Sequence, residues 1–276
     1  GKSKLIQLGV QEINIIDLVK PNTKYAVMLK SSEDIRYELE KAYHYAVKGR
    51  PGPVWIDIPA NMQSTEINPD KLRSYKERKS NYIKKIVFNE IETLKNRLIS
   101  SKRPIILAGH GVRLSKSSEK LIHFAECHNI PIATTWNASD IIDSNHSLFI
   151  GRPGAFAERG ANFAIQNSDF ILTLGTRLPF MVTSYNSTDF ARNSFKVMID
   201  IDPFELKKND FQFDLKINMD VSVFLDKLIN LKISFKGDLK WVSKCQEIRQ
   251  KYPILDLEKK KKSKYVNSYV FIDQLS

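Results

Sequence analysis

The chain has 276 residues, of which 42% are hydrophobic and 27% charged, a composition typical of a globular protein with one or two domains. No apolar run approaches the ~20 residues that a membrane helix needs, so we expect no membrane partner. The two cysteines lie far apart in the sequence, which suits a reducing compartment better than a disulfide scaffold, and we expect a cytoplasmic protein.

The formal net charge of +12 raises the question of nucleic-acid binding. Two short segments, 71–85 and 258–264, have net charges of +6 and +4 and so account for most of this net charge, and neither shows apolar periodicity. Solvated linkers explain such segments better than a nucleic-acid groove does, because no zinc finger or aromatic-interleaved basic face accompanies them. We therefore expect no nucleic-acid partner.

Residues 1–62 are predicted to be the C-terminal part of an α/β domain. A short strand or loop and then a helix are expected over 5–19, followed by a capped helix over about 31–48. A strand is expected over 54–58, with no strand partner of its own. These few elements cannot bury enough surface to stand alone, so we expect the rest of this domain upstream of Gly1.

Residues 63–85 are predicted to be a basic linker, and residues 86–235 a Rossmann-like central domain. Strands alternate with helices through this region, which indicates parallel pairing and right-handed crossovers. The fold class is therefore α/β, a three-layer domain with a mostly parallel sheet of five or six strands. The expected helices are 89–100, 115–127, 155–165 and 221–231, and the expected strands are 105–108, 130–134, 170–174, 196–201 and 215–219.

Residues 236–276 are predicted to hold a helix over 241–251, a second basic linker and the truncated start of a further domain. The last residues, from Val266 on, resemble the beginning of a helix.

The turn Gly109-His110-Gly111 follows a predicted strand and opens a helix. Glycines at such a place expose backbone N–H groups, so a phosphate could approach the N-terminus of the helix. The alternative is a tight turn that needs glycine for backbone reasons alone. A full dinucleotide fingerprint would have glycine in place of Leu114, so the turn by itself does not decide between the two.

Two further sites carry alternative interpretations. Asp200 and Asp202 end a strand and could accept a ribose hydroxyl or could cap the following loop. Arg177 follows the strand that ends at Gly175, and it could hold a phosphate, stack on an adenine or form a surface salt bridge.

The residue pattern shows no self-contained catalytic set. The five histidines have no metal-ligand spacing, and neither a G-x-S-x-G elbow nor a P-loop is present. We expect no metal site and no catalytic residue within the chain.

A family resemblance covers nearly the whole sequence. Residues 49–59, GRPGPVWIDIP, resemble the end of the pyrimidine-binding domain of thiamine-diphosphate-dependent enzymes, and acetolactate synthase large subunits are the most similar members. The stretches 102–111, 149–178 and 197–206 resemble the central domain of that family. Residues 266–269 resemble the entry to its diphosphate-binding domain.

The resemblance implies a carboligase or decarboxylase that acts on a 2-oxo acid with thiamine diphosphate and Mg²⁺, and that forms a homodimer or homotetramer when complete. It places the catalytic glutamate upstream of Gly1 and the Gly-Asp-Gly…Asn metal motif downstream of Ser276. The chain alone is therefore expected to be inactive. Gln11 and Lys24 match positions that line the mouth of the active site.

The central domain of acetolactate synthase binds FAD. The positions that match its pocket are Gly109, His110, Gly111, Thr135, Gly154, Gly175, Arg177, Asp200, Ile201 and Asp220. Flavin-binding members continue after the arginine with an Asp-Asp-Arg-like run, where this chain has Leu178-Pro179-Phe180-Met181. An ADP-type ligand, or a purely structural domain with an empty pocket, is the alternative to FAD.

Overall fold

A computed structural model describes residues 9–10, 13–77, 87–183, 185–208, 212–255 and 265–275 of the chain, apart from the side chains of 87 and 88. It divides the chain into two compact units, 1–82 and 83–276. Each unit is described by itself below.

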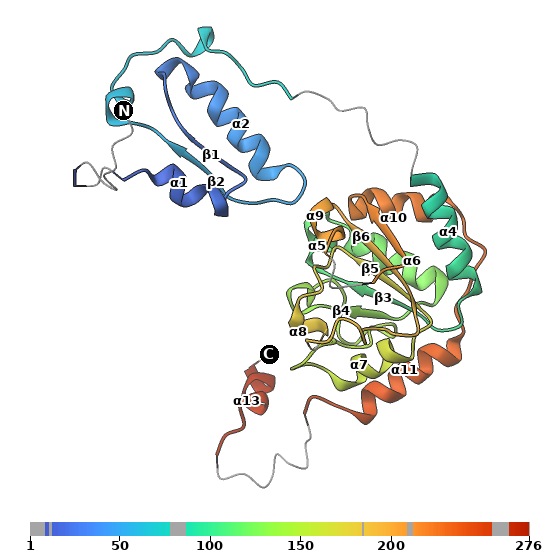
Figure 1. Ribbon diagram of the computed structural model, residues 1–276. Helices are drawn as coiled ribbons and strands as arrows, with labels where there is room; N and C mark the ends of the chain where they lie inside the picture. Colours follow the sequence, from blue (N-terminus) through green and yellow to red (C-terminus); the bar gives the residue numbers. More distant parts are fainter. Residues whose placement is uncertain are drawn as a thin grey trace. The chain divides into compact units, whose positions relative to one another are not determined.

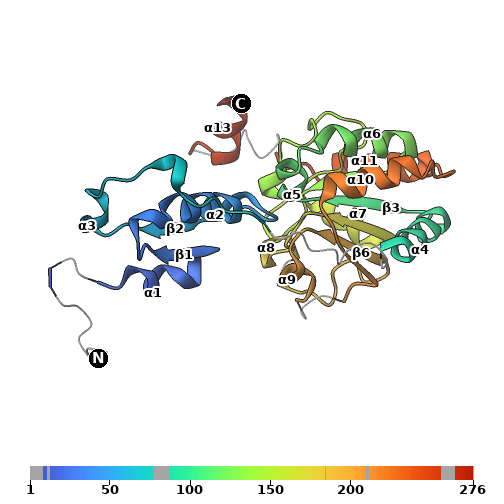
Figure 2. The ribbon, with the colours of Figure 1, turned by 90° about the horizontal axis from the view of Figure 1, so that it is seen from above.

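The first unit holds a two-stranded parallel sheet with a helix packed along it (Figure 2). Strand β1 (Tyr25–Met28) pairs with β2 (Val54–Asp57), in the register that sets Tyr25 opposite Val54. Helix α2 (Ile35–Val47) contacts both strands. The short helices are α1 (Ile15–Val19), η1 (Lys20–Asn22), η2 (Ser32–Asp34), α3 (Ala60–Gln63) and η3 (Pro69–Lys71).

The expectation that β2 has no strand partner was wrong. Strand β1 is only four residues long and ends beside polar Lys30 and Ser31, so its sequence carries little strand signal. Its pairing with β2 is fixed by contacts across about 30 residues of chain, which no local pattern reports.

The described part of the predicted linker lies against α2. The Glu40 carboxylate accepts hydrogen bonds from Ser74 Oγ and Tyr75 N, each 2.7 Å long, and the ring centroids of Tyr37 and Tyr75 are 5.5 Å apart. Hydrogen bonds from Arg36, Ser74 and Tyr75 lower the pKa of Glu40 to about 2. Residues 78–86 of the predicted linker lie outside the described residues, and the domain boundaries stay predictions.

The second unit is built on a five-stranded parallel sheet with the order β4-β3-β5-β6-β7. The chain runs from β3 outward to β4 at one edge, then returns to β5 on the other side of β3 and continues to β7. The bounds are β3 (Pro104–Ala108), β4 (Ile132–Thr134), β5 (Phe170–Leu174), β6 (Phe195–Asp200) and β7 (Leu215–Asn218).

Helices cover both faces of this sheet and make it the middle of three layers (Figure 1). The described helices of the unit are α4 (Val87–Ser100), α5 (His110–Leu114), α6 (Ser118–His128), η4 (Trp136–Ala138), α7 (Arg159–Asn167), α8 (Phe180–Thr183), α9 (Pro203–Leu206), α10 (Val221–Asn230), α11 (Leu239–Lys251) and α13 (Ser268–Leu275). The expected α/β class and parallel sheet are confirmed.

Two hydrophobic cores lie on opposite faces of the sheet because side chains alternate along each strand. Ile106 of β3 belongs to the core under α4, α6 and α10, whereas its neighbours Ile105 and Leu107 belong to the core under α7 and α11. Trp241 of α11 fills the second core and donates its indole N–H to the Pro104 carbonyl at 3.1 Å.

Helix α7 begins later than predicted. The sequence suggested a helix from Ala155, but residues 151–158 form a loop and the helix starts at Arg159. The φ of +146° at Gly154 lies outside the helical region, and the next amide, that of Ala155, donates to the Met181 carbonyl at 2.9 Å, so the chain is held as a loop from Gly154 on.

Both cysteines are free thiols. Among the described residues, no helix combines the length and the apolar character that crossing a bilayer requires.

Candidate functional site

The carboxyl ends of β3 and β5 form the point where the sheet order reverses. Open α/β sheets bind their ligands outside the strand ends at such a point. Strand β3 is followed by Gly109 and β5 by Gly175, so the sequence places its predicted glycine turns here.

The two glycine turns pack tightly against each other. A Cβ atom added at Gly109 would lie 2.4 Å from the Gly175 carbonyl oxygen, and one at Gly111 would lie 2.7 Å from the Gly175 Cα. The Gly109 N–H donates to the Leu174 carbonyl at 2.8 Å and the Gly111 N–H to the Gly175 carbonyl at 2.9 Å. The close approach of the two backbones therefore explains why these positions hold glycine. Two of the amides that could have bound a phosphate donate to backbone carbonyls instead.

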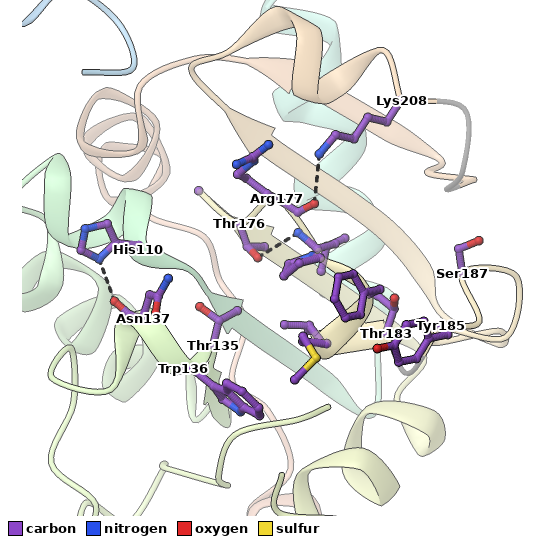
Figure 3. Close-up of a pocket in the computed structure, with 16 residues that line it drawn as sticks. His110, Thr135, Trp136, Asn137, Thr176, Arg177, Thr183, Tyr185, Ser187 and Lys208 are labelled. Atoms are coloured by element: carbon purple, nitrogen blue, oxygen red, sulfur yellow. Dashed lines mark hydrogen bonds between the residues drawn. The ribbon is translucent and has the colours of Figure 1, made fainter. Parts of the chain in front are cut away.

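A cavity of about 770 Å³ lies beside these turns (Figure 3). Figure 3 shows His110 and Asn137 on one side of it and Thr183 and Tyr185 on the other. The lining residues come from the loops after β3, β4 and β5, from α8 and the loop that follows it, and from the segment after α9: His110, Thr135, Trp136, Asn137, Gly175, Thr176, Arg177, Leu178, Pro179, Phe180, Met181, Val182, Thr183, Tyr185, Ser187 and Lys208.

Basic groups line this cavity, and none of the described residues of its lining is acidic. Arg177 Nε lies 2.6 Å from Glu205 Oε1, while more than half of the Arg177 side chain stays exposed. Lys208 also pairs with Glu205, and its Nζ is 3.4 Å from the Arg177 carbonyl (Figure 3). The salt-bridge interpretation of Arg177 is therefore realised, and the side chain still borders the cavity.

Glu205 is the buried counter-ion behind these two cations. Burial by itself would raise the pKa of its carboxyl, but hydrogen bonds from Lys208 and Arg177 outweigh burial and lower the pKa. A carboxylate held ionised in this way fixes the two cations at the rim of the cavity.

Exposed aromatic side chains form another part of the lining. Trp136, Phe180 and Tyr185 are exposed by 42%, 52% and 70%, although large aromatic side chains usually bury most of their surface. The ring centroids of Phe180 and Tyr185 are 4.6 Å apart. The cavity thus offers flat apolar rings together with cations, which is a surface suited to an anionic ligand that carries a planar ring.

The histidine in the glycine turn is held by a neighbouring loop. His110 Nδ1 lies 2.7 Å from the Asn137 carbonyl oxygen, so this contact orients the exposed ring at the cavity edge (Figure 3). Thr135 is buried beside it and donates its backbone N–H to the Ala108 carbonyl at 2.9 Å.

Four of the ten residues proposed for a nucleotide pocket line this cavity, namely His110, Thr135, Gly175 and Arg177. Gly109 and Gly111 support it through the backbone contacts described above. Gly154 is outside the lining, but its loop contacts Met181, which lines the cavity.

The remaining three, Asp200, Ile201 and Asp220, lie at the ends of β6 and β7. The carboxylates of the two aspartates accept hydrogen bonds from backbone amides. Asp200 accepts from the Asp202 N–H at 2.8 Å, and Asp202 caps α9 by accepting from the Phe204 N–H at 2.9 Å. Asp220 caps α10 through the Ser222 and Val223 amides. Ile201, between the two aspartates, borders solvent. These contacts agree with loop capping, and none of the three lines the cavity.

In the first unit, Lys24 Nζ donates to the carbonyl oxygens of Lys48 and Arg50 at 2.6 and 2.7 Å. Its ammonium group therefore binds the turn after α2. Gln11 lies outside the described residues.

Trp136, Tyr185 and Lys208 line the cavity but were not singled out from the sequence. They lie in loops after β4, after α8 and after α9, where no periodicity reports the direction of a side chain. The sequence signal that could have found Trp136 is its place directly after a strand and the pair Thr134-Thr135.

Within the described parts of the chain, no group of three or more His, Cys, Asp or Glu side chains is placed to hold a metal ion.

Comparison with known proteins adds a family match. The family model described as "Thiamine pyrophosphate enzyme, central domain" matches residues 91–228, which contain the sheet and the cavity. This match covers half of the chain.

Acetolactate synthase large subunits are among the curated relatives of this chain. A probable acetolactate synthase large subunit of Methanococcus aeolicus is 34% identical over 80% of this chain and 36% of its own length. A second, of Methanocaldococcus jannaschii, is 32% identical over 91% of this chain and 43% of its own length. The acetolactate synthase large subunit of Lactococcus lactis is 32% identical over 86% of this chain and 41% of its own length. The chain spans about two fifths of the length of these relatives.

Proposed function

The chain belongs to the thiamine pyrophosphate enzymes and resembles acetolactate synthases. We therefore propose that it is part of a carboligase or decarboxylase that acts on a 2-oxo acid. The central-domain match, on a five-stranded parallel sheet, is the observation that carries this proposal. Thiamine diphosphate with Mg²⁺ would supply the carbon nucleophile and the electron sink for such a reaction. Homodimer or homotetramer formation and a cytoplasmic location belong to the same proposal, and the free thiols are consistent with a reducing compartment.

We also propose that residues 1–276 do not form a complete thiamine site by themselves. Mg²⁺ in such a site needs carboxylate or carbonyl oxygens around it, and the described residues contain no cluster of acidic groups able to hold a metal. The one residue matched to the active-site mouth whose position is described, Lys24, binds backbone carbonyls of its own unit.

This proposal predicts that thiamine diphosphate with Mg²⁺ leaves the melting temperature of the purified chain unchanged. A ligand that binds only the folded state raises the melting temperature in a concentration-dependent way. A saturable rise with thiamine diphosphate would contradict the proposal, since it would demonstrate a working site within these residues.

The cavity supports a second candidate function, a nucleotide-binding module. Its cations suit phosphates and its exposed rings suit a purine, so an adenine nucleotide such as ADP, or FAD, fits the chemistry of the lining. The flavin-type Asp-Asp-Arg run is replaced by Leu178-Pro179-Phe180-Met181, and these residues form the apolar part of the wall. We propose ADP or a related nucleotide ahead of FAD for this reason.

A melting experiment with ADP and FAD distinguishes the candidates. We expect a saturable rise with ADP, and Arg177→Gln should weaken ADP binding by about tenfold because one charge-assisted contact is lost. Arg113→Gln is the matched control, because Arg113 is an exposed arginine that pairs with Asp140 and is not part of the lining. A purely structural domain with an empty pocket predicts no rise with either nucleotide.

A further inference from the structure

Helix α8 forms one wall of the cavity, and the loop before α7 contacts its backbone. One side chain of α7, that of Asn162, holds this loop through hydrogen bonds. We propose that Asn162 is a positioning residue, which sets the position of the α8 wall through the loop of residues 151–158. The effect on ligand binding rests on the nucleotide function proposed above, whereas the effect on the wall itself does not.

The first step is a pair of hydrogen bonds between Asn162 and a single residue of the loop. Its Oδ1 accepts from the Gly154 N–H at 2.8 Å, and its Nδ2 donates to the Gly154 carbonyl at 2.8 Å. Both polar groups of Gly154 are therefore satisfied by one side chain. Such a reciprocal pair fixes the orientation of the backbone as well as its position.

The second step is the conformation of Gly154. Its φ of +146° is open almost only to glycine, and a Cβ atom there would lie 2.2 Å from the Met181 carbonyl oxygen. The loop backbone thus runs directly against α8. Gly154 has no side chain to block this approach, and its hydrogen bonds with Asn162 keep its backbone in place against Met181.

The third step is the bond from the loop to the wall. The Ala155 N–H donates to the Met181 carbonyl at 2.9 Å. Helix α8 has only four residues and cannot provide an internal partner for every carbonyl, so the loop supplies the partner for this one. Met181 lines the cavity. Its backbone is bonded to Ala155, which directly follows the Gly154 that Asn162 holds.

The loop is also fixed at its other end, independently of Asn162. Glu158 Oε1 accepts from the Arg152 N–H and from its guanidinium, each at 3.1 Å, and the Glu158 N–H donates to the Arg152 carbonyl at 2.9 Å. The loss of Asn162 should therefore release the middle of the loop while its ends and α7 remain in place.

Hydrogen exchange on the full chain tests the inference without any ligand. In Asn162→Ala, the amides of Gly154 and Ala155 should exchange about 10- to 50-fold faster, while amides of β3 and β5 keep their rates. Asn167→Ala is the matched control, because Asn167 lies on the same helix and its side-chain amide donates to the Phe163 carbonyl of that helix. Asn162→Asp keeps the acceptor for the Gly154 N–H, so it should give an intermediate effect and serves if the alanine variant folds poorly.

The ligand arm uses ADP as the probe. If the wild-type chain binds ADP, Asn162→Ala should weaken that binding about 5- to 20-fold, and Asn167→Ala should not. Unchanged exchange at Gly154 and Ala155 would overturn the inference. Faster exchange with unchanged ADP affinity would overturn the link from Asn162 to the wall. If the wild-type chain does not bind ADP, the nucleotide proposal fails, and the exchange rates still decide whether Asn162 holds the loop.

Discussion

At the scale of single residues, Asp169 ties together the amino ends of β3 and β5. Its carboxylate accepts from Ser101 Oγ at 2.5 Å and from the Lys102 and Arg103 amides at 2.9 and 2.8 Å. Burial alone would raise the pKa of this carboxyl, but these hydrogen bonds outweigh burial and lower it below the ordinary value of 3.8. The ionised form therefore stabilises the fold.

Replacing Asp169 by asparagine should lower the free energy of unfolding of the second unit by about 1–3 kcal/mol near neutral pH, because a charged acceptor of three donors is lost. Since the pKa is lower in the folded state, this contribution is present above the unfolded-state value and is lost as pH falls through the folded value. Urea titrations at about pH 7 and about pH 3 should show a difference between wild type and variant that shrinks at low pH. Asp226→Asn, at an exposed ion pair with Lys120, should show little change at either pH.

The candidate site was predicted in part, and the reason lies in what each side chain does. His110, Thr135 and Arg177 follow strand ends, a place that parallel sheets assign to ligands, and they line the cavity. Asp200 ends β6 and Asp220 follows β7, yet their oxygens accept from backbone amides. A sequence shows that a carboxylate lies at a strand end. It does not show whether a backbone amide donates a hydrogen bond to that carboxylate.

At the scale of elements, the buried strands were predictable and the short ones were not. Strands β3 and β5 are continuous apolar runs because helices cover both of their faces, and their observed bounds lie within one residue of the prediction. Strand β1 and the start of α7 depend on pairing and on a loop conformation, which apolar periodicity does not report.

The contact between the glycine turns after β3 and β5 leads to a prediction for Gly111→Ala. The new Cβ would meet the Gly175 backbone at 2.7 Å, and neither turn can move without disturbing its strand, so we expect a loss of about 2–4 kcal/mol in the free energy of unfolding. Urea denaturation followed by circular dichroism measures this loss. Arg113→Ala, an exposed change on the same short helix, should cost below about 1 kcal/mol. Equal effects of the two variants would show that the turns can separate freely.

At the scale of the whole molecule, the two units differ in the amount of core that they bury. The second unit has a hydrophobic core on each face of a five-stranded sheet. Among the described residues of the first unit, only Leu29 and Ala42 are fully buried apolar side chains, and its sheet has two strands. Two-stranded sheets are marginally stable by themselves, because they bury too little surface to offset the entropy of ordering the chain.

Native-state hydrogen exchange should therefore find the first unit far less protected than the second. Two amides make a matched comparison: the Leu29 N–H donates to the Asp57 carbonyl and the Ile106 N–H to the Pro131 carbonyl, both at 2.9 Å, and both residues are at most 3% exposed. Because exchange of such amides follows the free energy of opening, the Leu29 amide should exchange at least about 100-fold faster than that of Ile106. Their hydrogen bonds and burial are alike, so the size of the surrounding core is the main remaining cause of a difference. Equal protection would mean that the first unit draws stability from contacts beyond its own two buried side chains.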